Sequence, residues 1–328
     1  MIAIESADRT TALVAHRTPL DRAVRLSQHL GAEIWLKRDD LTGLGLGGNK
    51  VRVLECLIAD ARAQGADCIV TGAGPRSNWA MLAAAAANVA GLDTYLVYYG
   101  APVPPRGNHD LAVKLGAHVR FTRSADRASV DSGIAQLARQ LSDAGRRPYA
   151  IPRGGATPVG AMGYVKGGIE LLTQADELDI TPTDIWLPTG SCGTQAGLLM
   201  ACRSMARECR VVGVTVSRPV EECRERVKDL ATGVSALVDL APGPPVENDV
   251  CIVDGFRGAG YGIPSPEGQK AAELVARTEG IFLDPVFGAK AMAALVRHIE
   301  LGDVDGPVVF LVTGGAPNLF VPGTDSGV

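Results

Sequence analysis

Short runs of β-branched and other apolar residues recur along almost the whole chain, each followed by a longer amphipathic stretch. Runs of this length that are bounded by turn residues are typical of β-strands. Because most of them are apolar throughout, they predict strands that are covered on both faces, as in a parallel sheet. The predicted strands are Ile34–Lys37, Cys68–Thr71, Tyr95–Tyr98, His118–Phe121, Tyr149–Ile151, Ile185–Leu187, Val211–Val216, Cys251–Val253 and Val308–Val312.

The segments between these strands have the periodicity of helices. The predicted helices are Val51–Ala63, Asn78–Val89, Ile134–Ala144, Gly193–Ala206, Glu267–Glu279 and Ala289–Ile299. Strands that alternate with helices predict an α/β fold with parallel-rich twisted sheets flanked by helices. In such folds ligands bind beyond the carboxyl ends of the strands, where glycine-rich turns lead into helices. We therefore expect the functional residues in those turns.

The overall composition argues against several classes of function. The chain has 328 residues and a formal net charge of −4, so it has no basic excess that would favour nucleic acid. No apolar run reaches the roughly 20 residues that span a bilayer, and no secretory signal is recognisable at the N-terminus. The five histidines and seven cysteines are scattered, without HExxH or CxxC. We expect no metal site, reduced thiols and a cytoplasmic location.

The first glycine-rich turn, Gly43–Lys50, has the spacing of the GxGxxG dinucleotide fingerprint at Gly43, Gly45 and Gly48. A true fingerprint begins directly at the end of a strand, and the strand after it ends in an acidic residue. Here polar residues intervene, and the next strand ends in Thr71. The context therefore argues against a dinucleotide site.

Lys50 gives this turn a second interpretation. It begins an amphipathic helix immediately after flexible glycines, where partial desolvation can produce a nucleophilic amine able to form an imine. The alternative is a solvated surface lysine, and spacing alone does not exclude it.

The second and fourth turns place polar side chains at the ends of predicted strands. Ser77 and Asn78 end the second turn at the start of an alanine-rich helix, where both residue types also serve as ordinary N-caps. Thr313 begins the fourth turn, after an apolar strand. Taken locally, the sequence favours ordinary N-capping for the second turn and a simple connection for the fourth.

The third turn, Thr189–Thr194, joins a strand to a helix through small residues. Small residues allow consecutive backbone N–H groups to converge, and the helix dipole adds positive potential. This turn is a candidate phosphate cradle. It contains no basic residue, which suits a permanently bound phosphate monoester better than a nucleotide phosphate in transfer; a tight connection is the alternative.

Taken together, the turns occur within a series of short motifs in a fixed order. These motifs are Arg17–Leu20, Leu36–Asp40, Gly47–Lys50, Ser77–Asn78, Ile151–Pro152, Gly160–Tyr164, Gly190–Thr194, Gly213–Ser217, Gly260–Pro264, Leu283–Val286 and Thr313–Pro317. In this order they resemble the fold type II (tryptophan synthase β-like) pyridoxal 5′-phosphate (PLP) enzymes. The branch that they resemble contains D-cysteine desulfhydrase, 1-aminocyclopropane-1-carboxylate (ACC) deaminase and L-cysteate sulfo-lyase. The resemblance implies a small α/β domain, residues 51–158, inserted into a larger PLP-binding domain formed by residues 1–50 and 159–328.

The resemblance also implies catalytic roles for three residues. Lys50 would hold PLP as a Schiff base and carry the proton at the α-carbon of the substrate. Ser77 would lie near the substrate carboxylate or the leaving group. Tyr261 would point into the substrate pocket.

Further residues would bind the cofactor, again by resemblance. Asn78 would hydrogen-bond the 3′-oxygen of PLP, and Thr313 would face the pyridine nitrogen. The hydroxyl of Thr313 cannot hold that nitrogen protonated as a carboxylate would. The 5′-phosphate would be held by Gly190, Ser191, Cys192, Gly193 and Thr194.

Three residues of the expected substrate pocket depart from the family pattern. Trp79 follows Ser77 and Asn78 where the family usually has His or Gln, and Arg76 takes a position that is usually Gln-like. Phe287 replaces the tyrosine of Asp-Pro-Val-Tyr, so the pocket loses a phenol and gains bulk.

The expected reaction is α,β-elimination from a small amino acid with a β-leaving group. The resemblance favours D-cysteine, which would give pyruvate, ammonia and sulfide. Elimination from, or replacement on, another amino acid such as L-cysteate is an alternative, as is a PLP-binding protein with little turnover. The only partners expected are the amino-acid substrate and, from the habit of the family, a second copy of the chain in a homodimer.

Overall fold

The computed structural model describes residues 12–238, 243, 245 and 249–320, and its strands form two sheets. The larger has six strands in the order β1-β2-β10-β7-β8-β9, and only the pair β1–β2 is antiparallel. The smaller has four parallel strands in the order β5-β4-β3-β6. The bounds are β1 Leu20–Arg22, β2 Ile34–Lys37, β3 Cys68–Ala73, β4 Asp93–Tyr98, β5 His118–Phe121, β6 Pro148–Ala150, β7 Asp184–Thr189, β8 Arg210–Thr215, β9 Cys251–Val253 and β10 Val308–Leu311.

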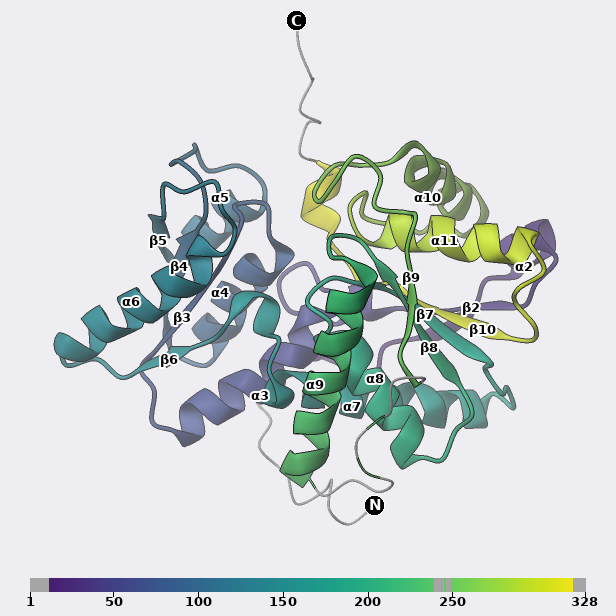
Figure 1. Ribbon diagram of the computed structural model, residues 1–328, viewed down its shortest axis with the longest axis horizontal. Coiled ribbons are helices and arrows are strands. Elements are labelled where there is room, and N and C mark those ends of the chain that lie inside the picture. Colours follow the sequence, from purple (N-terminus) through teal and green to yellow (C-terminus); the bar gives the residue numbers. More distant parts are fainter. Residues whose placement is uncertain (1–11, 239–242, 244, 246–248, 321–328) are drawn as a thin grey trace, which may run out of the picture.

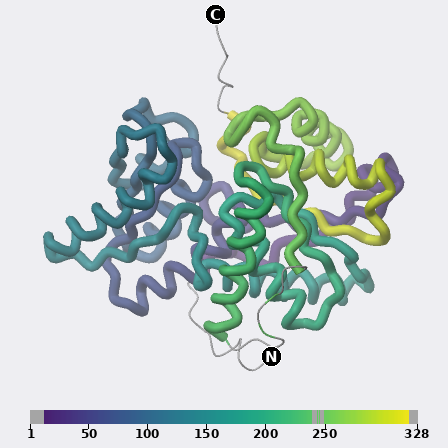
Figure 2. The backbone as a smooth tube through the Cα atoms, in the orientation of Figure 1, coloured from purple at the N-terminus to yellow at the C-terminus, as the bar shows by residue number. Residues whose placement is uncertain are grey.

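Helices flank both sheets, which confirms the predicted α/β class (Figure 1). Helices α4, α5 and α6 surround the smaller sheet, whereas α2, α10 and α11 lie on one side of the larger. Figure 2 shows the two sheet regions side by side, joined by the chain near the centre of the molecule. The bounds are α2 Val24–Leu30, α3 Lys50–Ala63, α4 Asn78–Val89, α5 Asn108–Lys114, α6 Ser129–Asp143, α7 Pro158–Glu177, α8 Gly193–Ser204, α9 Val220–Val238, α10 Pro266–Glu279 and α11 Gly288–Glu300.

All nine predicted strands and all six predicted helices are present, with ends shifted by a few residues. The sequence interpretation did not include β1, a three-residue antiparallel edge strand that buries one side chain, Leu20. It also did not include α2, α5, α7 and α9. The sequence of α7 contains several glycines, which weaken a helical pattern, although the helix itself is continuous.

Two glycines, one in α7 and one in α8, lie where neighbouring helices pack closely together. A Cβ atom at Gly163 would lie 2.0 Å from the backbone oxygen of Arg52 in α3. A Cβ atom at Gly197 of α8 would lie 2.4 Å from the backbone oxygen of Ala161. The three helices thus approach one another too closely for larger side chains at these positions.

A buried ionic cluster fastens α3 to α7. The Arg52 side chain donates to Asp39 Oδ2 at 2.9 Å and to Glu170 Oε1 at 2.8 Å. Tyr164 Oη donates to Asp39 Oδ2 at 2.6 Å, and Lys37 Nζ donates to Glu170 Oε1 at 2.5 Å. Because Arg52 is only two residues from Lys50, this cluster also fixes the start of α3.

The predicted domain division is compatible with this arrangement but its boundaries stay a prediction. The smaller sheet takes its strands from residues 68–150, within the proposed insert of residues 51–158. Strands of the larger sheet come from both flanking parts of the chain. Among the helices that the structure describes, none combines the length and the apolar character needed to cross a membrane.

Candidate active site

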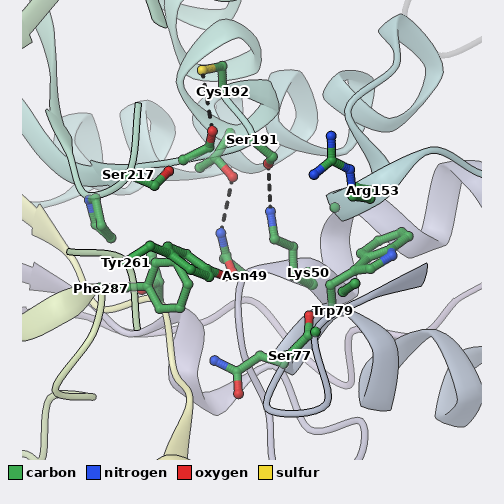
Figure 3. Close-up of a pocket in the computed structure, with 18 of the residues that line it drawn as sticks. Asn49, Lys50, Ser77, Trp79, Arg153, Ser191, Cys192, Ser217, Tyr261 and Phe287 are labelled. Carbon is green, nitrogen blue, oxygen red and sulfur yellow. Dashed lines mark hydrogen bonds between the residues drawn. The ribbon is translucent and has the colours of Figure 1, made fainter. Parts of the chain in front are cut away.

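A cavity lies at the carboxyl ends of strands from both sheets (Figure 3). Its walls come from the segments that follow β3 in the smaller sheet and β7, β8 and β10 in the larger one. The cavity encloses about 1030 Å³, including the open space at its mouth. Eleven residues expected at the site line it: Lys50, Ser77, Asn78, Trp79, Gly190, Ser191, Cys192, Thr194, Tyr261, Phe287 and Thr313.

Lys50 is the first residue of α3, and its side chain points into the cavity (Figure 3). Its Nζ atom donates a hydrogen bond to Ser191 Oγ at 3.2 Å. Burial lowers the pKa of Lys50 to about 8, although the nearby Cys192 thiol opposes the shift. The amine is therefore neutral more often near neutral pH than that of a solvated lysine, which is the requirement for a nucleophile.

The glycine turn before Lys50 is held rigidly by local hydrogen bonds. Thr42 Oγ1 accepts from the backbone N–H of Gly48 at 2.8 Å, and the N–H of Asn49 donates to the carbonyl of Thr313 at 3.0 Å. Gly47 has φ +71°, and a Cβ atom there would lie 1.9 Å from the backbone oxygen of Asp40. The glycine is thus required by both conformation and space.

The loop after β7 wraps the opposite side of the cavity and starts α8 at Gly193. Cys192, just before the helix, has the left-handed φ of +74°. Asn49 Nδ2 donates to Thr194 Oγ1 at 3.1 Å, which ties this loop to the start of α3. The first backbone N–H groups of α8 have no acceptor within their own helix, so the loop presents donors to an anion.

Ser77 and Asn78 begin α4 at a third side of the cavity. Ser77 is the N-cap, and its Oγ accepts from the N–H of Ala80 at 3.4 Å. The Oδ1 atom of Asn78 accepts from Asn108 Nδ2 at 2.7 Å and from Asn318 Nδ2 at 3.2 Å. Both contacts occupy the carbonyl end of the Asn78 amide, so its NH₂ group remains free to donate to a ligand.

Aromatic side chains form the remaining wall. The Trp79 ring is buried, and its Nε1 donates to Thr71 Oγ1 at 2.9 Å. Tyr261 and Phe287 meet edge to face, with ring centroids 6.0 Å apart. In Figure 3, Trp79 lies on one side of Lys50, and Tyr261 and Phe287 lie on the other. Desolvation raises the pKa of Tyr261, so its phenol stays protonated at neutral pH.

Comparison with known proteins identifies the family to which the chain belongs. The family model described as pyridoxal-phosphate dependent enzyme matches residues 12–314. The chain belongs to this PLP-dependent enzyme family. It is 37% identical to a D-cysteine desulfhydrase of Yersinia enterocolitica over 324 residues, with 94% of each chain covered. It is also 37% identical to the D-cysteine desulfhydrase of Serratia proteamaculans over 320 residues, again with 94% of each chain covered.

Solved structures show the same fold. The crystal structure of an ACC deaminase homologue superposes with a TM-score of 0.91 at 33% identity, covering 97% of this chain and 95% of the other. A serine racemase from Dictyostelium discoideum superposes with a TM-score of 0.68 at 18% identity, covering 96% of this chain and 97% of the other. The expected fold type II PLP architecture is thereby confirmed.

The residues of the cavity fit PLP. The free donors at the start of α8 suit its phosphate, and the Lys50 amine suits its aldehyde carbon. Thr189 Oγ1, at the start of the same loop, is buried and has no hydrogen-bond partner among the described residues. No Asp or Glu lines the cavity in the part of the chain that the structure describes, so nothing there repels the phosphate.

Two residues expected at the site do not line the cavity. Arg76 is exposed and does not line the cavity, because the turn directs its side chain to solvent while its carbonyl accepts from Asn108. Gly193 does not line the cavity either, and a Cβ atom there would meet only the Cα of Ala156 at 3.9 Å. A small side chain at position 193 would therefore have room, so steric crowding does not explain the glycine.

Several lining residues were not singled out from the sequence. Ser217 ends one of the recognised motifs, and Arg153 directly follows another, so these two could have been found. Arg127 precedes a helix in a segment without any motif. The lining residues missed include Asn49, Tyr99, Arg127, Arg153, Ser217 and Arg218.

Proposed function

We propose that this enzyme catalyses α,β-elimination from D-cysteine to pyruvate, ammonia and sulfide. The observation that carries the proposal is the Lys50 amine, held at 3.2 Å from Ser191 Oγ with its pKa lowered to about 8, inside a cavity that fits PLP. Two relatives named D-cysteine desulfhydrase, each 37% identical over nearly the whole chain, support the choice of substrate.

In the proposed reaction, Lys50, Ser77 and Asn78 act on the cofactor and the substrate. PLP, when bound, withdraws electrons from the α-carbon of the substrate. Lys50 holds the cofactor and takes the α-proton, because its neutral amine is a base close to neutral pH. Ser77 and the start of α4 hold the substrate carboxylate, and the Asn78 NH₂ group donates to the 3′-oxygen of the cofactor.

The other side chains position the cofactor and shield the reaction. The loop Gly190–Thr194 holds the 5′-phosphate through backbone N–H groups. Thr313 would face the pyridine nitrogen with a hydroxyl, which would not fix a proton on that nitrogen. Trp79, Tyr261 and Phe287 cover the substrate and keep water away from it.

The test is a substrate screen that measures keto-acid formation by the holoenzyme. The substrates are both enantiomers of cysteine, L-cysteate, D-serine and ACC, and Lys50→Ala is the inactive control. We expect D-cysteine to exceed ACC by about a hundredfold in kcat/KM, because ACC has no α-hydrogen and Phe287 cannot act as an acid or base on its ring. Cofactor absorbance without any keto-acid product would instead indicate a PLP-binding protein with little turnover.

We also propose that the enzyme is a cytoplasmic homodimer. The cytoplasmic location is supported by the seven cysteines, all of which are free thiols and six of which are buried. The dimer is supported by exposed large apolar side chains, among them Phe282, which is 71% exposed, and Leu46, which is 53% exposed. Sedimentation equilibrium of the holoenzyme would test the dimer, and a monomer mass would contradict it.

A further inference from the structure

The charges that line the cavity are all positive among the described residues. They are Lys50, Arg127, Arg153 and Arg218. Two of these arginines have a carboxylate partner: Arg153 Nη2 lies 2.7 Å from Asp131 Oδ2, and Arg218 pairs with Glu222. Lys50 is assigned to the cofactor in the proposed function. Arg127 is the cation that remains.

Arg127 has no ion-pair or side-chain hydrogen-bond partner within the described ranges. Its guanidinium carbon lies 4.1 Å from the centroid of the Tyr261 ring. Stacking on the ring holds the planar guanidinium in place but leaves its N–H groups unpaired. A fixed, half-buried guanidinium with free donors binds a carboxylate or sulfonate strongly, because two N–H groups can reach two oxygens at once.

The cofactor phosphate is not the expected anionic partner of the Arg127 guanidinium. That phosphate belongs to the loop Gly190–Thr194, where Arg218 already supplies a cation, with its Nε donating to the Gly190 carbonyl at 2.9 Å. Arg127 contacts the Tyr261 ring, whereas the atoms nearest to a Cβ built on Gly190 belong to Val216, Ser217 and Phe287, at 3.7–3.9 Å. Arg127 is thus not among the nearest neighbours of Gly190 in that loop.

We propose that the cavity accepts an amino acid with a second anionic group, a carboxylate or sulfonate on the side chain, and that Arg127 binds this group. The proposal rests on the proposed function, in which Ser77 and the start of α4 hold the α-carboxylate. It extends the expected substrates of the proposed elimination from D-cysteine to amino acids with an acidic side chain. The ring of Tyr261 sets the plane of the guanidinium, and so the direction from which the anionic group approaches.

The first test is binding, measured by calorimetry on the holoenzyme. The ligands are aspartate and asparagine, which have nearly the same shape but differ in side-chain charge. We expect aspartate to bind about tenfold or more tightly than asparagine, since a charge-assisted hydrogen bond is roughly twice as strong as one between neutral groups. Arg127→Gln should remove the preference, and Arg127→Lys, which keeps the charge but not the fork, should retain part of it.

The matched control is Arg76→Gln, which removes an arginine near the cavity that does not line it. This control should keep the preference for aspartate. If Arg127→Gln weakens aspartate and asparagine equally, Arg127 binds the α-carboxylate and the proposal is wrong. If it weakens neither ligand, Arg127 does not contact the substrate and the proposal is equally wrong.

A second test uses turnover. The ratio of kcat/KM for cysteate to that for cysteine should fall by about tenfold in Arg127→Gln and stay unchanged in Arg76→Gln. If the unmodified enzyme forms no keto acid from any amino acid, the proposed elimination fails. The calorimetric comparison of aspartate with asparagine would still test the role of Arg127, because it does not depend on turnover.

Discussion

Lys50 shows how one residue depends on its surroundings for reactivity. Its position at the start of α3 and its burial lower the pKa of its amine to about 8. We expect the rate at which the apoenzyme captures PLP to rise with pH and to level off above pH 8, because only the neutral amine reacts. At pH values well below 8, each decrease of one pH unit should lower the rate of PLP capture about tenfold. Stopped-flow absorbance at a series of pH values would measure this, and a rise that continues beyond pH 10 would show an unperturbed lysine.

Asn78 depends on two other amides for its orientation. Asn108, only 1% exposed, and Asn318 both donate to its Oδ1, which leaves its NH₂ group for the cofactor. We expect Asn108→Ala to weaken PLP binding by about tenfold, the equivalent of one hydrogen bond, and to shift the visible absorbance of the bound cofactor. Asn88→Ala is the control, because Asn88 lies in the same helix as Asn78 and donates to the Leu115 carbonyl on the exposed surface. An unchanged spectrum in Asn108→Ala would contradict a positioning role.

At the scale of elements, the contact between α3 and α7 contains a cluster of buried charged side chains. Arg52 is 4% exposed and neutralises Asp39, which is fully buried, together with Glu170. Its guanidinium helps to hold the pKa of the Asp39 carboxyl below its usual value, although burial alone would raise it. Replacing Arg52 with an uncharged residue would leave the negative charges of Asp39 and Glu170 without their main positive partner.

We therefore expect Arg52→Met to lower the free energy of unfolding by about 3–5 kcal/mol, as for other broken buried pairs. Arg17→Met is the matched control, because Arg17 pairs with Glu177 at 3.1 Å while both side chains are about half exposed. That change should have little effect on the free energy of unfolding, because solvent screens an exposed ion pair. Urea unfolding of both holoenzyme variants would measure the difference, and equal losses would show that the cluster is not a strong link.

At the scale of the whole molecule, the cavity draws on both sheet regions. Contacts between distant parts of the chain, such as Asn49 with Thr194 and Arg127 with Tyr261, cross from one wall to another. A ligand that binds these walls only in the folded state must stabilise the entire structure.

We expect removal of PLP to lower the melting temperature by several degrees. At a hundred times its Kd, a ligand contributes about 2.7 kcal/mol to stability. Pyridoxal without the phosphate should restore less of the loss, because it leaves the donors of the loop Gly190–Thr194 unused. Differential scanning calorimetry of the apoenzyme with each compound would measure this, and equal recovery would move the phosphate away from that loop.

The sequence alone determined nine of the ten described strands, the four glycine-rich turns and the fold class, because these depend on local patterns of apolar and turn residues. The resemblance of its motifs to the PLP enzymes also indicated Lys50, Ser77, Asn78 and Thr313, whereas their positions alone left simpler interpretations open. Only the tertiary structure decided which side chains meet. Asn78 and Asn318 are 240 residues apart, and the guanidinium of Arg127 reaches Tyr261 from the other sheet region. Arg76 illustrates the same limit, because its place beside the motif did not reveal that its side chain is exposed. Contacts of this kind depend on how the two sheets pack together, and no local pattern in the chain encodes that packing.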